Sequence, residues 1–116
     1  MNDQNNNSKD SNAIQADIFR YTKQMQYALY DLMASEPNSE IRTKAWLTFS
    51  KAMEKLTKID HSKLTNSEKN MLLKIIKAYE EMQNQNAYMI AEKGTFEILK
   101  AEVDTVNMIS SKSLSS

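Results

Sequence analysis

Residues 65–73 have the sequence Thr-Asn-Ser-Glu-Lys-Asn-Met-Leu-Leu, in which a helix start directly precedes an apolar run. The Thr65 hydroxyl is placed to accept a hydrogen bond from the backbone N–H of Glu68, and the Glu68 carboxylate to accept one from the backbone N–H of Thr65. This reciprocal capping box is the strongest local signal in the chain. It predicts an α-helix that begins at Asn66.

Apolar residues continue from this helix at a strict spacing of seven: Ile75, Met82, Met89, Phe96 and Val103. A single helix over residues 66–109 preserves that register. Gly94 falls inside the series, and a glycine often marks a helix end. The companion apolar positions also change sides near Gly94, so the apolar face rotates there. We expect a long helix with a kink near Gly94; the alternative is a break, after which the C-terminal part folds back as a fourth helix.

Two further amphipathic helices precede the capping box. Apolar residues recur at steps of four and three over residues 13–34 and again over residues 39–59, which is the spacing of one buried helix face. Pro37 disfavours helix at the residue before it, so residues 35–39 are expected to form a tight turn. We therefore predict an all-α fold, a three- or four-helix up-and-down bundle in which a helical hairpin packs on the long, kinked C-terminal helix.

The composition excludes several classes of site. The 116 residues contain no cysteine, one histidine, one glycine and one proline. Without cysteine there is no disulfide framework, no thiolate metal site and no cysteine nucleophile. One histidine cannot supply a two-imidazole metal site, and one glycine cannot form a glycine-rich phosphate loop. We therefore expect a protein without enzymatic activity, cofactor or bound metal.

The chain divides into one domain and two polar ends. Residues 1–12 contain five asparagines and residues 110–116 contain five serines, so both are expected to be disordered around a helical domain over residues 13–109. No apolar run approaches a membrane span, and the N-terminus lacks the apolar region of a signal peptide. These features predict a cytoplasmic protein without membrane contact. The high asparagine and lysine content is typical of an AT-rich bacterial or phage genome.

Two polar features invite a catalytic or metal-binding interpretation. His61 follows Asp60 in the linker before the capping box, where a histidine held by a carboxylate would act as a general base. A solvated loop histidine is the simpler interpretation. Six acidic residues form either a cation site or a solvated helix face, without any calcium-loop pattern. They are Glu80, Glu81, Glu92, Glu97, Glu102 and Asp104. In both cases we favour the simpler interpretation.

Positive charge concentrates in the middle of the chain. Residues 42–77 carry nine Lys or Arg against three acidic residues, whereas residues 78–109 carry two against six. Five lysines form a candidate face: Lys51, Lys55, Lys58, Lys63 and Lys69. Such a stripe binds nucleic-acid phosphates, contacts an acidic protein surface or is simply solvated. Because the chain has only two arginines, the usual readers of guanine, nucleic-acid binding is the alternative hypothesis rather than the first.

Aromatic and methionine side chains lie beside the apolar seams of the first two predicted helices. The candidate partner face consists of Phe19, Tyr27, Tyr30, Trp46 and Met53. Such residues are enriched at protein interfaces, although a wide core face also uses them. We therefore predict a small interaction protein (an adaptor, a regulator, or a chaperone-like or structural subunit) that binds a protein partner.

The supply of core residues is small. Leu, Ile, Val and Phe make up 23 of the 116 residues, which is close to the level at which chains stop folding alone. A small core favours sharing with a partner. The opposite charges of the middle and C-terminal parts would also align in an antiparallel pair. A homo-oligomer, most simply a homodimer with a coiled-coil-like contact, is therefore expected.

Overall fold

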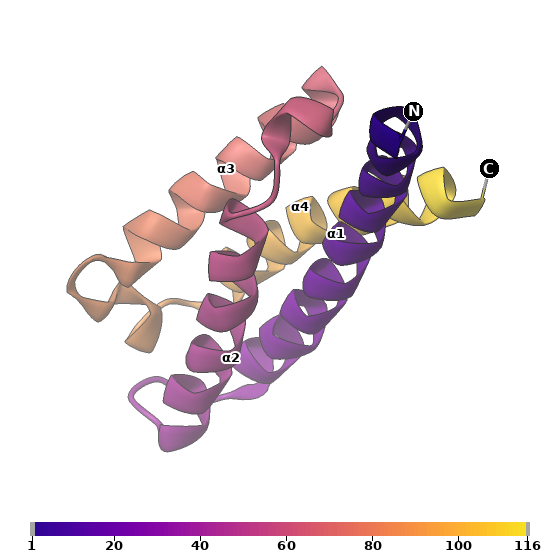
Figure 1. The fold of residues 1–116 in the computed structure, drawn as a ribbon. Coiled ribbons are helices and arrows are strands. Elements are labelled where there is room, and N and C mark those ends of the chain that lie inside the picture. The colour runs from indigo at the N-terminus through magenta and orange to yellow at the C-terminus, as the bar shows by residue number, and fades with distance from the viewer. Residues whose placement is uncertain (1, 116) are drawn as a thin grey trace.

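The computed structural model describes the backbone of residues 2–115 and the side chains of residues 11–115. Within residues 2–115 every regular element is helical and no strand occurs. The elements, shown in Figure 1, are four α-helices and two 3-10 segments: α1 (Asn2–Ala34), α2 (Glu40–Thr57), η1 (His61–Lys63), α3 (Asn66–Gln83), η2 (Asn84–Met89) and α4 (Lys93–Ser115). The predicted all-α class is confirmed.

α1 and α2 pack along one another, and a tight turn joins them (Figure 1). Asn38 in this turn has a left-handed backbone with a φ of 60°, a conformation that asparagine tolerates better than most residues. Ser39 then caps α2, because its hydroxyl accepts a hydrogen bond from the backbone N–H of Arg42 at 3.1 Å. The chain therefore turns where Pro37 predicts.

α3 begins where the capping box predicts. The Thr65 hydroxyl accepts a hydrogen bond from the Glu68 backbone N–H at 3.2 Å, and the Glu68 carboxylate accepts one from the Thr65 backbone N–H at 3.1 Å. Glu68 is almost fully buried, and its carboxylate also accepts a hydrogen bond from the side-chain amide of Gln15 at 3.1 Å. The cap therefore ties α3 to α1 as well as starting the helix.

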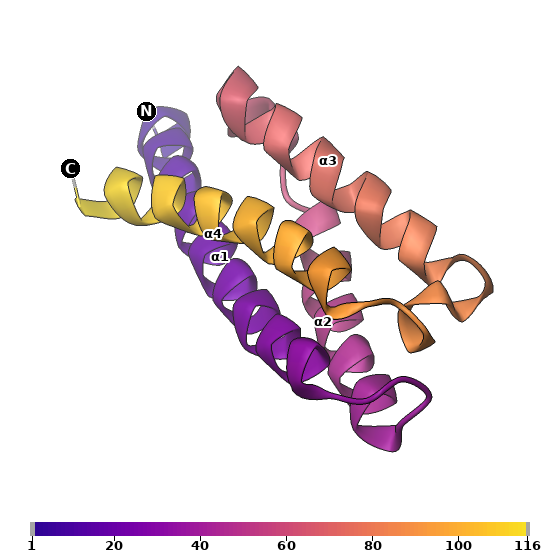
Figure 2. The same cartoon turned by 180° about the vertical axis from the view of Figure 1, so that it is seen from behind.

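The predicted long C-terminal helix is wrong. α3 ends at Gln83, and α4 begins at Lys93 and lies between α1 and α3 (Figure 2). Gln85 and Asn86 take left-handed φ angles of 54° and 56°, which end the helix and redirect the chain. The seven-residue spacing crosses this break because both helices bury apolar residues in the same core. The alternative prediction, a fourth helix after a break, matches the structure.

Gly94, which the sequence marks as the kink, lies in the first turn of α4. Its φ is not positive, and a methyl group on its α-carbon would meet no atom within 4 Å. Neither the backbone conformation nor the available space therefore requires glycine at this position.

One hydrophobic cluster joins all four helices. α1 contributes the central wall, with α2 packed on it and α4 crossing it (Figure 2). The largest fully buried side chains are Phe49 of α2 and Phe96 of α4. Within the described residues, the four helices of one chain therefore share one continuous hydrophobic core.

At the C-terminal end the structure differs from the sequence-based expectation. α4 continues to Ser115, whereas disorder is expected over residues 110–116. Ser110 is fully buried and lies one turn beyond Val106 and Asn107, which are also buried, so it continues the inward face of α4. A serine side chain is small enough to pack on this inward face, and the serine-rich composition alone does not indicate that it does.

At the N-terminal end α1 starts at Asn2, ahead of the predicted start at Ala13. The side chains of residues 1–10 lie outside the described residues, so the predicted disorder over residues 1–12 stays a prediction. Among the described residues, no helix combines the length and apolar character that crossing a bilayer needs.

Candidate functional site

Two tyrosines of the predicted partner face are exposed to solvent. Tyr27 and Tyr30 of α1 are 65 % and 57 % exposed, and Met108 of α4 is 56 % exposed. All three line an open groove of about 630 Å³ between α1 and α4, which we call the tyrosine groove. Its charged and amide side chains are Lys23, Gln26, Lys100, Asp104, Asn107 and Lys112. These three exposed apolar side chains come from both helices and share one groove.

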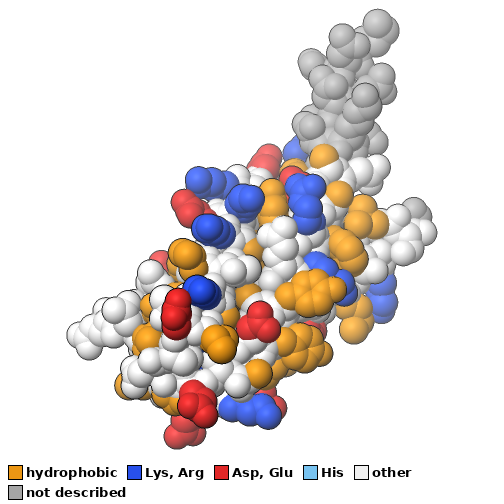
Figure 3. Space-filling view, turned by 90° about the horizontal axis from the view of Figure 1, so that it is seen from below, with side chains coloured by type: hydrophobic (Ala, Val, Ile, Leu, Met, Phe, Trp, Pro, Cys, Tyr) orange, Lys and Arg blue, Asp and Glu red, His pale blue; other side chains and the backbone are white. Residues whose placement is uncertain are grey.

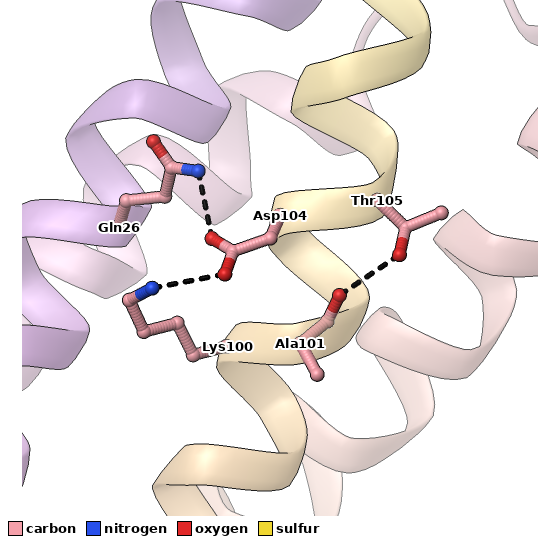
Figure 4. A network of polar contacts seen from close by, with 5 residues as sticks. All are labelled: Gln26, Lys100, Ala101, Asp104 and Thr105. Atoms are coloured by element: carbon pink, nitrogen blue, oxygen red, sulfur yellow. Dashed lines mark hydrogen bonds and ion pairs between the residues drawn. The ribbon is translucent and has the colours of Figure 1, made fainter.

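A hydrogen-bond network fixes the wall of the tyrosine groove (Figure 4). Lys100 and Asp104 lie one turn apart on α4, with 2.9 Å between the ammonium nitrogen and a carboxylate oxygen. The other carboxylate oxygen accepts a hydrogen bond from the Gln26 side-chain amide of α1 at 2.7 Å. The hydrogen bond that Lys100 donates to Asp104 raises the pKa of Lys100. Lys100 is therefore a fixed positive charge at the α1–α4 contact.

This fixed charge also holds an exposed ring. The Lys100 ammonium nitrogen lies 4.5 Å from the centre of the Tyr30 ring, within the range of a cation–π interaction. Tyr30 is nevertheless more than half exposed. The ring is thus oriented by the protein while much of its surface remains open for contact.

The groove continues along the same two helices. A neighbouring groove of about 270 Å³ shares Tyr30, Lys100 and Asp104 with the tyrosine groove and adds Met33 and Glu97. The lining residues on α4 therefore extend from Glu97 to Lys112, which corresponds to about 22 Å along a helix. The site is an elongated furrow rather than a small-molecule cavity.

A buried polar contact anchors α4 to α1 beneath one end of the furrow. The Asn107 side-chain amide donates hydrogen bonds to the Thr22 hydroxyl at 3.0 Å and to the Phe19 carbonyl at 3.2 Å. Thr22 is fully buried, and its hydroxyl donates to the Ile18 carbonyl at 2.6 Å. Because these groups satisfy one another out of water, they fix which faces of the two helices meet.

The other residues of the predicted partner face do not form an exposed surface with the two tyrosines. Phe19 is half-buried, whereas Trp46 and Met53 are 3 % and 0 % exposed and belong to the core. The assignment of Trp46 and Met53 to an exposed face is therefore wrong. The Trp46 ring lies nearly parallel to the rings of Tyr79 and Tyr88, at centre distances of 5.4 and 4.7 Å, because α3 and η2 cover this side of α2.

Arg42, which no sequence pattern singles out, is 2 % exposed at the start of α2. Its guanidinium donates hydrogen bonds to the carbonyls of Ser35 and Ala91, each at 2.8 Å, and to that of Met89 at 3.2 Å. The Phe96 ring centre lies 5.1 Å from its guanidinium carbon. Burial lowers the pKa of Arg42, and no ion pair of the described side chains includes it. Arg42 thus ties the end of α1 to the connection between α3 and α4.

Three of the five predicted lysines come together. Lys55 and Lys58 of α2 and Lys63 of η1 line a second open groove of about 520 Å³, which we call the lysine groove. Lys51 is exposed on α2 but does not line this groove, and Lys69 is half-buried on α3 outside it. The predicted stripe is therefore not one continuous site. On the face shown in Figure 3, hydrophobic side chains are interspersed with basic and acidic ones.

His61 and Asp60 do not form the pair that a general base would need. The Asp60 carboxylate accepts hydrogen bonds from the backbone N–H and hydroxyl of Ser62, at 3.0 and 2.6 Å, and these bonds lower the pKa of Asp60. The His61 Nε2 atom is buried without a hydrogen-bond partner. The carboxylate therefore caps η1 instead of orienting the imidazole.

Among the described residues, no three histidine or acidic side chains gather closely enough to hold a metal ion. The acidic residues of the C-terminal third therefore do not form a cluster of that kind there. Comparisons with protein-family models, curated proteins and solved structures find no match to this chain. The candidate sites accordingly rest on the geometry of the chain itself.

Proposed function

We propose that this chain is a small interaction protein without catalytic activity, and that it binds a protein partner in the tyrosine groove. The observation that carries the proposal is the exposure of Tyr27, Tyr30 and Met108 on a wall fixed by Lys100 and Asp104. Aromatic and methionine side chains are enriched at protein interfaces, and aromatic ones often dominate the binding energy. Rings that are oriented before binding lose little conformational entropy when a partner covers them.

The shape of the site favours an amphipathic helix as the bound segment. The furrow lies between two packed helices and follows α4 for about four helical turns and α1 for about three. Recognition of a helix in a groove uses apolar side chains at positions i, i+3, i+4 and i+7. Tyr27, Tyr30 and Met108 would contact that apolar face, while Lys23 and Lys112 would face acidic residues beside it.

The substitution Tyr30→Glu tests this proposal. The probe is a fluorescein-labelled helical peptide with leucines at i, i+3, i+4 and i+7 and no net charge, and its affinity is measured by fluorescence anisotropy. We expect wild-type protein to bind the peptide and Tyr30→Glu to weaken binding by at least about tenfold, because a charge would replace a central aromatic contact. The helical circular-dichroism signal should persist, because Tyr30 is more than half exposed.

Leu47→Glu is the matched control. Leu47 is 55 % exposed on α2 and lines neither groove, so this variant places the same charge on an equally exposed apolar position elsewhere. Equal weakening by both variants, or no binding of the peptide to wild-type protein, would contradict the proposal. If Tyr30→Glu alters the circular-dichroism signal, Tyr27→Glu at the more exposed neighbour provides the same test.

We further propose that the helices form an up-and-down bundle and that the chain acts as a cytoplasmic homodimer. Exposed apolar side chains outside the tyrosine groove support contact with a second copy of the chain; they include Ile41, Leu73, Ile90 and Ile98. The lack of cysteine suits a reducing compartment. Light scattering should give twice the chain mass of 13.4 kDa at micromolar concentration, and a strictly monomeric mass would contradict the dimer.

A further inference from the structure

The lysine groove has an apolar floor beneath a charged rim. Ile14 and Tyr21 of α1 and Ile59 after α2 line the groove and pack against the hydrophobic core. The Lys55 ammonium nitrogen lies 5.8 Å from the centre of the Tyr21 ring. Apolar surface and ammonium groups therefore meet within one groove, between α1 and the end of α2.

The acidic residues beside this groove are already engaged. Asp60 accepts two hydrogen bonds from Ser62, and Asp17 pairs with Arg20 of its own helix. Lys55 and Lys63 take part in no ion pair with the described side chains.

Lys58 is only loosely neutralised. Its ammonium nitrogen lies 3.7 Å from a Glu54 carboxylate oxygen, with both side chains more than two-thirds exposed. Exposed pairs of this kind contribute little free energy and separate easily. The rim of the lysine groove therefore offers positive charge that the chain itself leaves largely uncompensated.

We propose that the lysine groove binds an acidic peptide segment of a partner protein that carries an apolar anchor residue. The anchor covers Ile14, Tyr21 and Ile59, and carboxylates on either side of it face Lys55 and Lys63. Opposite charges steer and orient such a segment, while burial of the anchor contributes the non-directional part of the affinity. This site is separate from the tyrosine groove, so the two proposals stand or fall independently.

A nucleic-acid strand fits the same groove less well. Its phosphates can only accept hydrogen bonds, and the Asp17 and Asp60 carboxylates in the groove lining have none to donate. A peptide also brings backbone N–H groups, which can donate hydrogen bonds to those carboxylates. Base stacking needs a free aromatic face, whereas Tyr21 is half-buried with Lys55 over its ring.

Three labelled probes of equal length test the proposal by fluorescence anisotropy at about 50 mM salt, where phosphate contacts are strong. The first is a glutamate-rich peptide with two central leucines, the second contains glutamate alone, and the third is single-stranded DNA. We expect the leucine-containing peptide to bind most tightly. Lys55→Glu should weaken its binding about tenfold, because the substitution reverses a rim charge beside the anchor.

Lys51→Glu is the matched control, since Lys51 is exposed one turn earlier on α2 and lies outside the groove. It should change the affinity less than about twofold. Tighter binding of DNA would assign the groove to nucleic acid and overturn the proposal. Equal binding of the all-glutamate peptide, or equal losses from Lys51→Glu and Lys55→Glu, would overturn it as well. Tyr30→Glu should leave binding of the leucine-containing acidic peptide unchanged.

Discussion

Arg42 and Lys100 both place a cation over an aromatic ring, yet their surroundings differ. The Arg42 guanidinium carbon lies 5.1 Å from the Phe96 ring centre, and Arg42 is 2 % exposed. The Lys100 ammonium nitrogen lies 4.5 Å from the Tyr30 ring centre, and Tyr30 is 57 % exposed. The first pair lies where the α1–α2 turn meets the α3–α4 connection, which we call the closed end of the fold, and the second lies in the tyrosine groove.

The contact of Arg42 with Phe96 therefore stabilises the fold, whereas the contact of Lys100 with Tyr30 orients a ring that is still exposed to a partner. At the closed end the guanidinium donates to backbone carbonyls of the α1–α2 turn and of the α3–α4 connection, so its donors are used inside the protein. In the tyrosine groove Lys100 pairs with Asp104 one turn along its own helix and contacts the Tyr30 ring of α1, while Tyr30 remains more than half exposed. Substitutions at the closed end should therefore change stability, and substitutions at Tyr30 should change binding.

Arg42→Ala should produce the largest loss of stability. Removing the guanidinium takes away the side-chain donor of the Ser35 and Ala91 carbonyls, and we expect a loss of about 3 kcal/mol or more in the free energy of unfolding. Arg20→Ala is the control, because Arg20 is the only other arginine and is exposed; it should lose less than about 1 kcal/mol. Urea unfolding measures both. Similar losses in the two variants would refute the special role of Arg42.

Asp104→Asn should lower the free energy of unfolding by about 0.5–1 kcal/mol, because it removes a partly exposed ion pair and weakens the hydrogen bond from Gln26. The effect should depend on pH. The pKa of Lys100 is raised in the folded state, so its pairing with Asp104 stabilises the fold at neutral pH, and this contribution is lost as the pH rises through that raised pKa. The unfolding curves of wild type and variant should therefore converge at high alkaline pH. A constant difference across that range would contradict the assigned pairing.

Gln85→Gly, in the α3–α4 connection, should raise the free energy of unfolding by about 0.5–1 kcal/mol. Gln85 has a φ of 54°, a conformation that glycine adopts without a side-chain clash. Asn86→Gly, at a φ of 56°, should gain less because asparagine already tolerates this region. Melting temperatures rank the two variants. If Gln85→Gly lowers the melting temperature instead, the contacts of the Gln85 side chain contribute more free energy than its backbone strain costs.

Gly94→Ala should give the smallest effect, a gain of about 0.5 kcal/mol. A methyl group meets no atom within 4 Å there, and alanine lowers the entropy of the unfolded chain. Binding of the neutral helical peptide should not change, since Gly94 lines neither groove. A clear loss of stability would indicate that α4 needs a glycine near its start after all.

Local sequence signals were sufficient for the start of α3 and for the α1–α2 turn. The capping box of Thr65 and Glu68 completes its hydrogen bonds within four residues, so sequence spacing alone identifies it. The break after α3 has no comparable signal, because Gln85 and Asn86 replace the expected glycine and Arg42 holds the connection from far along the chain. The prediction placed the kink near Gly94, whereas the chain breaks between Gln83 and Lys93.

The candidate site was predictable only in part. Tyr27, Tyr30, Trp46 and Met53 all lie off the apolar seams, and periodicity cannot tell which of them another helix will cover. The break after α3 decides this, because it lets η2 and α3 cover Trp46 while α4 packs beside Tyr30. In the folded chain Trp46 and Met53 therefore belong to the core, whereas Tyr27 and Tyr30 remain exposed.

An NMR titration of the isotope-labelled protein with the neutral amphipathic helical peptide shows where that peptide binds. Backbone amide shifts should change around Tyr27, Tyr30 and Met108, on both helices that line the tyrosine groove. The amides near Lys55 and Lys63 in the lysine groove should change little. Shifts concentrated in the lysine groove, scattered over all four helices or absent at saturating peptide would contradict the assignment of the tyrosine groove as the partner-binding site.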